Sequence, residues 1–354
     1  MMNSRTLTRR GALMGIGGGL CMLPARGAVA RGGLPSAPVN MVKPPRLRNG
    51  DVLGIVAPAG FVADRFGIEE VAATVRAMGL VPRVAPHLTQ RHGYLAGTDE
   101  VRARDLMSMF ADDDVRGILA VRGGWGSARL LPHLDFATIR KKPKLFAGFS
   151  DNTALCLALA SQGVVSIHGP NASASWPQAS WESFHRVAFE GTLPTYSVPV
   201  RDGPGLGARG TGVRTFRGGK AQGRLIGGNL TVLSALVGTP FLPSFDRAIL
   251  FLEDTNEAEY RIDRMLTQLA LSGALDKVAG VVFGQCTRCE NPDGGYSNFT
   301  LYEVLDQRFG SLGKPAFQGL MIGHVANQIS VPVGIMAEMD ADAGTLRLLE
   351  PAVV

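Results

Sequence analysis

The chain has 354 residues, of which 45% are hydrophobic and 45 are glycines, enough for two domains or one large one. No run of about eighteen apolar residues occurs, so a membrane-spanning helix is not expected. Residues 1–30 hold four of the 36 basic residues and no acidic one, which leaves 32 basic residues against 30 acidic ones, a charge of +2. The basic excess of the whole chain therefore mostly describes its first thirty residues, and no nucleic-acid partner is expected from it.

The N-terminus has the features of an export signal. Arg9-Arg10 precedes a weakly apolar run over residues 11–23, and the small residues Ala28-Val29-Ala30 follow. This order predicts a twin-arginine signal peptide over residues 1–30, cleaved after Ala30, and a periplasmic mature protein. The alternative is a disordered basic N-terminus, and lipid attachment at Cys21 fits the pattern less well.

Residues 45–195 are predicted to form an N-terminal α/β domain that carries the nucleophile. β-rich segments alternate with helical patterns, which is typical of a doubly wound parallel sheet with functional groups at the carboxyl ends of its strands. The expected strands are Val52–Ala57, Arg83–His87, Gly117–Val121, Leu145–Phe149 and Val164–Ile167, and the expected helices are Ile68–Met78 and Val101–Phe110.

Residues 196–222 differ from the regions on either side. Their glycines and scattered basic residues predict an interdomain linker or exposed loop. A second α/β domain is expected over residues 223–354, with strands at Arg247–Glu253 and Val278–Phe283. Between these strands lies an apolar stripe at helical spacing that we assign to the core, namely Ile262, Met265, Leu266 and Leu269.

A serine at a strand-to-helix junction is the clearest candidate nucleophile. An apolar strand leads into Gly148-Phe149-Ser150-Asp151, and a helical pattern then runs to about Gln162, with Gly163 as its C-cap. This context lifts a serine onto a sharp turn, near a helix N-terminus whose dipoles stabilise negative charge. The hydrolase pattern G-x-S-x-G is not met, and the alternative is that Ser150 or Asp151 only caps the helix.

A serine nucleophile needs a base and an acid that orients the base. Two histidines, His168 and His324, stand in glycine-rich contexts at predicted strand ends. Glu253 ends a hydrophobic strand, and Asp254 beside it is the competing carboxylate. The order Ser150, Glu253, His324 is compatible with a catalytic triad but does not establish one.

Two glycine-rich turns are candidates for substrate contact. Arg122-Gly-Gly-Trp-Gly126 follows a predicted strand, and its small residues can present N–H groups to an oxyanion. Phosphate binding is the competing interpretation, but no Walker lysine follows and the G-x-G-x-x-G spacing is absent. Gly227-Gly-Asn-Leu230 is a tight strand-to-helix turn, for which interdomain packing and substrate contact are both open interpretations.

The cysteines do not indicate a metal site. Cys156 falls on the apolar face of a predicted helix, and Cys286 and Cys289 form a single C-x-x-C without a second pair. An oxidising compartment would permit a disulfide between these two, but two ordinary thiols are the preferred interpretation.

Several separated sequence blocks occur in the order found in one peptidase family. They are Val56-Ala-Pro58, Arg122-Gly-Gly-Trp-Gly126, Gly148-Phe-Ser-Asp151, His168-Gly-Pro170, Gly227-Gly-Asn-Leu230, Leu252-Glu-Asp254 and Gly323-His324. On these blocks the chain after residue 30 resembles the L,D-carboxypeptidase family, which includes muramoyl-tetrapeptide carboxypeptidases and microcin C self-immunity peptidases.

The resemblance implies a fold and a set of residue roles. The fold would be an N-terminal flavodoxin-like, doubly wound parallel sheet domain plus a C-terminal swivelling β/α domain, and the chain would form a homodimer. Ser150 would be the nucleophile, His324 the base and Glu253 the orienting acid.

The implied reaction is hydrolysis of the L,D peptide bond between meso-diaminopimelate and the terminal D-alanine of a murein tetrapeptide stem, without metal or cofactor. The backbone amides of Asp151 and of Gly123 or Gly124 would hold the oxyanion. The candidate substrate contacts are Arg122, for a free carboxylate, Trp125 and Asn229.

Three positions depart from the family pattern. Trp125 and Phe149 stand where tyrosine is more common, and Asn171 stands where methionine is common. They flank the chemistry and therefore bear on substrate preference. Two other functions compete with murein hydrolysis: a microcin C-type peptidase, which would need an aromatic patch to stack adenine, and a non-catalytic periplasmic binding protein, which would not need all three triad residues.

Overall fold

A computed structural model describes residues 40–63, 65–199, 212–289 and 299–354. The predicted signal peptide, residues 1–30, lies outside these described residues. None of the described helices is long and apolar enough to cross a membrane.

The first sheet has six strands in the order β12-β5-β4-β3-β1-β2. The strands β2-β1-β3-β4-β5 are parallel and follow the flavodoxin-like order, as expected. Their bounds are Val52–Val56 (β1), Val81–Val84 (β2), Val115–Ala120 (β3), Leu145–Gly148 (β4) and Ser166–His168 (β5). The antiparallel edge strand β12, Val331–Val333, comes from the C-terminal part of the chain, so residues 223–354 do not all belong to the second sheet.

Several predicted strands are shifted by two residues or more, and the second strand shows why. We expected Arg83–His87, but β2 ends at Val84. Pro86 has no N–H to donate to a sheet, and the backbone N–H of His87 is bound to the Asp105 carboxylate instead.

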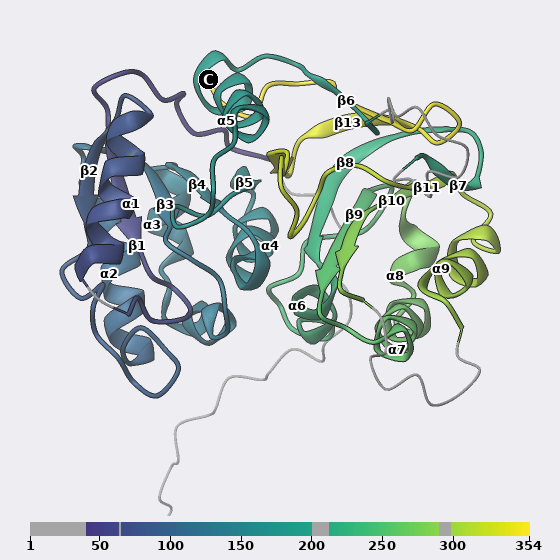
Figure 1. The fold of residues 1–354 in the computed structure, drawn as a ribbon, viewed down its shortest axis with the longest axis horizontal. Helices are drawn as coiled ribbons and strands as arrows, with labels where there is room; N and C mark the ends of the chain where they lie inside the picture. Colours follow the sequence, from purple (N-terminus) through teal and green to yellow (C-terminus); the bar gives the residue numbers. More distant parts are fainter. Residues whose placement is uncertain (1–39, 64, 200–211, 290–298) are drawn as a thin grey trace, which may run out of the picture. The chain divides into compact units, whose positions relative to one another are not determined.

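The helices around the first sheet differ in how deeply they are buried. In chain order they are α1 (Arg65–Ala77), α2 (Asp99–Ala111), α3 (Phe136–Lys141), α4 (Thr153–Ser161) and α5 (Gln178–His185), with short helical turns at Ser127–His133, Ser150–Asn152 and Arg186–Glu190. Every residue of α4 from Thr153 to Ala160 is buried, because this helix lies between the two sheets and contacts β5, β8 and α6 (Figure 1). That position explains why its sequence is apolar on all sides.

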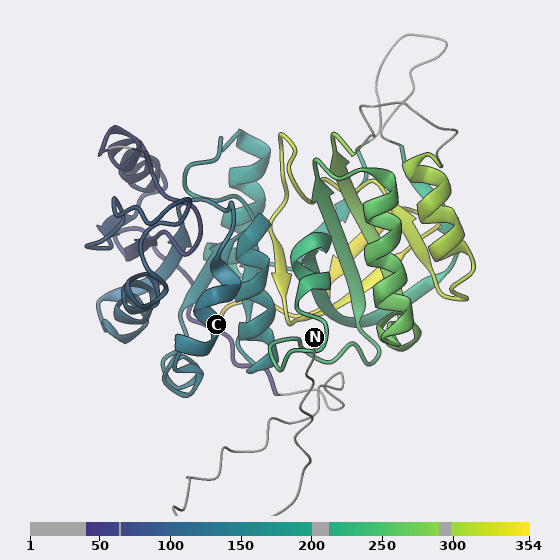
Figure 2. The same cartoon turned by 90° about the horizontal axis from the view of Figure 1, so that it is seen from below.

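The second sheet has eight strands in the order β6-β14-β13-β8-β9-β10-β11-β7. Its centre is parallel: β8 (Lys220–Asn229), β9 (Ile249–Thr255), β10 (Gly280–Thr287) and β11 (Ala316–Gln318). Antiparallel strands flank it: β6 (Thr195–Ser197), β7 (Arg214–Arg217), β13 (Met336–Asp340) and β14 (Thr345–Leu348). Its helices are α6 (Leu230–Ala235), α7 (Glu259–Leu271), α8 (Ala274–Lys277) and α9 (Leu301–Gly310), and Figure 2 shows α7 and α9 side by side.

The described parts of residues 196–222 are not simply a linker. They hold the end of β6, all of β7 and the start of β8. The side chains of β7 are largely exposed, because it is an edge strand. Its sequence therefore lacks the apolar residues by which a strand is recognised. The apolar stripe of α7 behaves as expected, with Ile262, Leu266 and Leu269 fully buried.

Candidate active site

Ser150 follows β4 directly and has a left-handed backbone, with φ of 62°. A non-glycine residue rarely adopts this conformation, and such strain is concentrated at functional sites. A short 3-10 turn, Ser150–Asn152, leads from it into α4. The strand, the sharp turn and the helix therefore occur in the predicted order, and the serine projects from the turn into a cavity.

Ser150, His324 and Glu253 form one chain of hydrogen bonds. The distance from His324 Nε2 to Ser150 Oγ is 3.0 Å, and that from His324 Nδ1 to Glu253 Oε2 is 2.8 Å. Glu253 lies on β9 and is completely buried, whereas His324 follows β11 and remains partly exposed. Residues 174 positions apart in the sequence are thus brought into the arrangement that general-base activation of a serine requires.

Gly323 allows the histidine to approach the acid. Its φ is 114°, and a Cβ there would lie 2.6 Å from Glu253 Oε2. Only glycine fits this combination of conformation and space.

Asp254, the competing carboxylate, points elsewhere. Neighbouring side chains on a strand face opposite sides, and Asp254 accepts hydrogen bonds from Asn229 Nδ2 and from the backbone and hydroxyl of Thr231. Burial raises the pKa of its carboxyl group. Asp254 therefore anchors the start of α6 and does not reach the histidine.

His168, the competing base, is also placed differently. It is fully buried, and neither ring nitrogen has a hydrogen-bond partner in the described structure. Its ring contacts Phe149 and Phe251 edge-on. Burial, assisted by the nearby His324, lowers the pKa of His168 to about 3, so its imidazole stays neutral.

The turn that carries Ser150 is held by amide side chains. Asn171 Oδ1 accepts from the backbone N–H of Phe149 and from Asn152 Nδ2. The Asp151 carboxylate accepts from the N–H of Ser127, so this side chain faces away from the serine. Asn171, which departs from the family pattern, thus has a structural role at the turn.

The glycine loop after β3 lies against the serine. A Cβ on Gly123 would be 2.8 Å from Ser150 Cβ and 3.2 Å from the backbone nitrogen of Asp151. Gly123, Gly124 and Arg122 line the same cavity as Ser150. Trp125 does not; it is 53% exposed and stacks edge-on against Tyr94.

Asn229 has a structural position. Its side-chain oxygen accepts from the N–H of Val232 at the N-terminus of α6, and its amide nitrogen donates to Asp254. It is buried and does not line the cavity that contains Ser150. The structure does not bring it together with the other candidate substrate contacts.

The cavity beside Ser150 has a volume of about 690 Å³. It contains one arginine that we predicted, Arg122, and one that sequence reasoning missed, Arg288. No motif marks Arg288; the only available signal was its position inside the C-x-x-C. The cavity is also lined by Thr255, Asn256 and His324.

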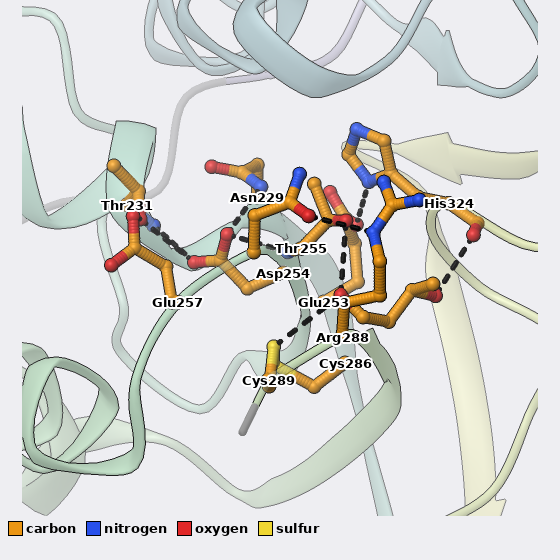
Figure 3. Close-up of a disulfide and its surroundings, with 12 residues drawn as sticks. Asn229, Thr231, Glu253, Asp254, Thr255, Glu257, Cys286, Arg288, Cys289 and His324 are labelled. Atoms are coloured by element: carbon orange, nitrogen blue, oxygen red, sulfur yellow. Dashed lines mark hydrogen bonds and ion pairs between the residues drawn. A yellow bond between two sulfur atoms is a disulfide. The ribbon is translucent and has the colours of Figure 1, made fainter. Parts of the chain in front are cut away.

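The preferred interpretation of Cys286 and Cys289 as two unlinked thiols is wrong for this structure, because they form a disulfide (Figure 3). Cys286 is at the end of β10, and the left-handed conformation of Arg288, with φ of 56°, turns the chain back. The two Cα atoms are therefore 5.4 Å apart, within bonding range. Cys156 is buried and free, as expected for a core residue. Among the described residues, no group of three or more His, Cys, Asp or Glu is arranged to hold a metal ion.

Two family models match the chain. One, described as the LD-carboxypeptidase N-terminal domain, covers residues 53–169, and the other, the LD-carboxypeptidase C-terminal domain, covers residues 222–339. A Synechocystis sp. protein named as a carboxypeptidase is 38% identical over 89% of this chain and 100% of its own length. The murein tetrapeptide carboxypeptidase of Pseudomonas aeruginosa is 30% identical over 82% of this chain and 93% of its own.

Solved structures share the fold. The muramoyltetrapeptide carboxypeptidase of Oxalobacter formigenes matches with a TM-score of 0.71 and 31% identity, covering 84% of this chain and 97% of that one. The microcin C7 self-immunity protein matches with a TM-score of 0.79 and 23% identity, covering 88% of this chain and 100% of that one. The second similarity shows the fold alone.

Proposed function

The chain belongs to the LD-carboxypeptidase family, and from that premise we propose that it releases the terminal D-alanine of murein tetrapeptide stems by serine catalysis. The bond cleaved is the L,D bond that follows meso-diaminopimelate. The proposal rests on the hydrogen-bond chain Ser150–His324–Glu253. Its first two residues line the cavity of about 690 Å³.

The proposed reaction has two halves. His324 Nε2 takes the Ser150 proton as Oγ attacks the peptide carbonyl, and then donates it to the departing amine of D-alanine. Water, activated by the same nitrogen, hydrolyses the acyl-enzyme. Glu253 Oε2 accepts a hydrogen bond from Nδ1–H, which keeps Nε2 free to act as a base and stabilises the imidazolium that forms.

The oxyanion of the tetrahedral intermediate is proposed to bind backbone N–H groups. The candidates are Asp151, at the start of the helical turn, and Gly123 or Gly124 in the neighbouring loop. The close approach of Gly123 to both Ser150 Cβ and the Asp151 nitrogen supports this assignment.

The alternative of a microcin C-type peptidase has less support. A nucleotide substrate calls for aromatic rings that stack on the base, and Phe149 is the one phenyl, phenol or indole ring among the described residues that line the cavity. Its ring already contacts both His168 and His324. A non-catalytic binding protein would have no need of the assembled hydrogen-bond chain.

A defined tetrapeptide tests the proposal. Incubation with a murein tetrapeptide that ends in meso-diaminopimelate–D-alanine should release D-alanine, detected by mass spectrometry. The matched control substrate ends in L-alanine and should remain intact. If the wild-type chain leaves the D-alanine peptide uncut, the proposed function is wrong.

We also propose export by the twin-arginine route, supported by Arg9-Arg10 and the Ala28-Val29-Ala30 exit. Protein recovered from the periplasm should begin at Arg31, and an Arg9→Lys/Arg10→Lys precursor should stay in the cytoplasm. Uncleaved wild-type protein found only in the cytoplasm would contradict export. Homodimer formation stays a prediction from the resemblance.

A further inference from the structure

Arg288 lies in the catalytic cavity and has no charged partner among the described residues. It lines the cavity together with Ser150 and His324. Its Nε donates to Asn256 Oδ1 at 2.7 Å, and no carboxylate among the described residues forms an ion pair with it. The two Nη groups therefore remain available to an anion that enters the cavity.

The turn that carries Arg288 is bonded to His324 and to the segment that follows Glu253. Thr287 Oγ1 donates to the backbone oxygen of His324 at 2.8 Å. The backbone oxygen of Thr287 accepts from the N–H of Asn256 and from Thr255 Oγ1, just beyond Glu253 on β9. The Cys286–Cys289 disulfide closes this turn, as Figure 3 shows.

The geometry of the reaction decides which arginine suits a terminal carboxylate. His324 protonates the nitrogen of the departing amino acid, and the carboxylate carbon of that residue is only two bonds from this nitrogen. The cation must therefore lie on the His324 side of the cavity. Arg288 follows the residue bonded to His324, whereas Arg122 follows β3 and is bonded to the backbone oxygen of Phe61.

We propose that Arg288 binds the C-terminal carboxylate of the substrate and that the Cys286–Cys289 disulfide holds Arg288 in position. The guanidinium offers two parallel N–H donors, which suit a carboxylate. The inference rests on the proposed carboxypeptidase function, because only a free carboxy terminus supplies this anion beside the cleaved bond.

Binding without turnover tests the inference. The probes are the tetrapeptide with a free C-terminal carboxylate and the same peptide with a C-terminal carboxamide, titrated by calorimetry into protein that carries Ser150→Ala. The acid should bind about ten- to a hundredfold more tightly than the amide, as charge-assisted hydrogen bonds do. Adding Arg288→Gln should reduce this ratio to within about threefold.

Three variants in the same background serve as comparisons. Arg104→Gln removes an exposed arginine on α2 and should keep the full ratio. Arg122→Gln should keep it too, because this arginine is bonded to the backbone oxygen of Phe61 and is not part of the turn bonded to His324. Cys286→Ser/Cys289→Ser should lower the ratio to an intermediate value while the protein remains folded by circular dichroism.

The outcomes separate the two proposals. Three results would overturn the role of Arg288. The ratio of acid to amide affinity could be unchanged in Arg288→Gln, it could be lost in Arg122→Gln, or neither peptide could bind. A full ratio in the cysteine variant would overturn the role of the disulfide. If Arg288 sets the ratio but the wild-type chain releases no D-alanine, the proposed function is wrong and the carboxylate site stands.

Discussion

The proposed nucleophile and its proposed base are held by regions of different construction. Ser150 is on a local turn between β4 and α4, and residues of the first-sheet region, Asn152 and Asn171, support the turn. His324 is in an irregular segment after β11, and two strands of the second sheet hold it, through Glu253 on β9 and Thr287 on β10. The nucleophile's position is encoded locally, whereas that of the base depends on the whole second sheet.

Loss of either reacting group should have the largest effect. Ser150→Ala and His324→Ala should each lower kcat by at least about three orders of magnitude, because one removes the nucleophile and the other the base. Glu253→Gln should cost less, since this side chain orients the base. Circular dichroism checks the fold, and near-wild-type turnover in either alanine variant would rule out the triad.

Gly123→Ala tests the region that surrounds Ser150. The added methyl group would lie 2.8 Å from Ser150 Cβ and displace the proposed oxyanion loop, so kcat should fall about a hundredfold with a smaller change in KM. Gly212→Ala is the control, because a Cβ there meets no atom within 4 Å. Full activity in Gly123→Ala would show that this loop does not approach the reacting atoms.

The buried His168 should make stability sensitive to acid. Its pKa is lowered to about 3 in the folded chain, while an unfolded histidine titrates near ~6.5. Between these values only the unfolded state takes up the proton, so stability is complete above about pH 6.5 and falls by about 1.4 kcal/mol per pH unit below it.

Unfolding by urea between pH 7 and pH 4 measures this loss. His168→Leu should show a shallower pH dependence than the wild type, and His92→Gln, a change at an exposed histidine, should behave like the wild type. Identical slopes for wild type and His168→Leu would contradict the buried neutral imidazole.

Asn229→Ala should have the smallest effect and act on stability. The side chain caps α6, and the loss of such a cap costs about 1 kcal/mol. Asn229→Ser, which can still cap the helix, should recover most of that loss in thermal unfolding. An increase in KM shared by both variants, without loss of stability, would instead support the substrate contact predicted from the sequence.

Much of the fold could be predicted because it depends on short-range patterns. Alternating apolar strands and helices identified β1, β3 and β4 within a residue or two, and the apolar composition of α4 agrees with its burial between the sheets. The edge strands β6, β7 and β12 were missed. They are short, and their pairing partners lie far away in the sequence.

What the sequence determined by itself was the turn at Ser150, since a strand, a glycine and a helix start are adjacent in the chain. The choice of Glu253 over Asp254 and of His324 over His168 followed from family resemblance, and in the structure strand alternation and burial account for it. Only the tertiary structure decided that Cys286 and Cys289 are joined and that Arg288 faces the cavity. These features arise where β9, β10 and the segment after β11 meet. A local sequence pattern does not predict which distant strands will be neighbours.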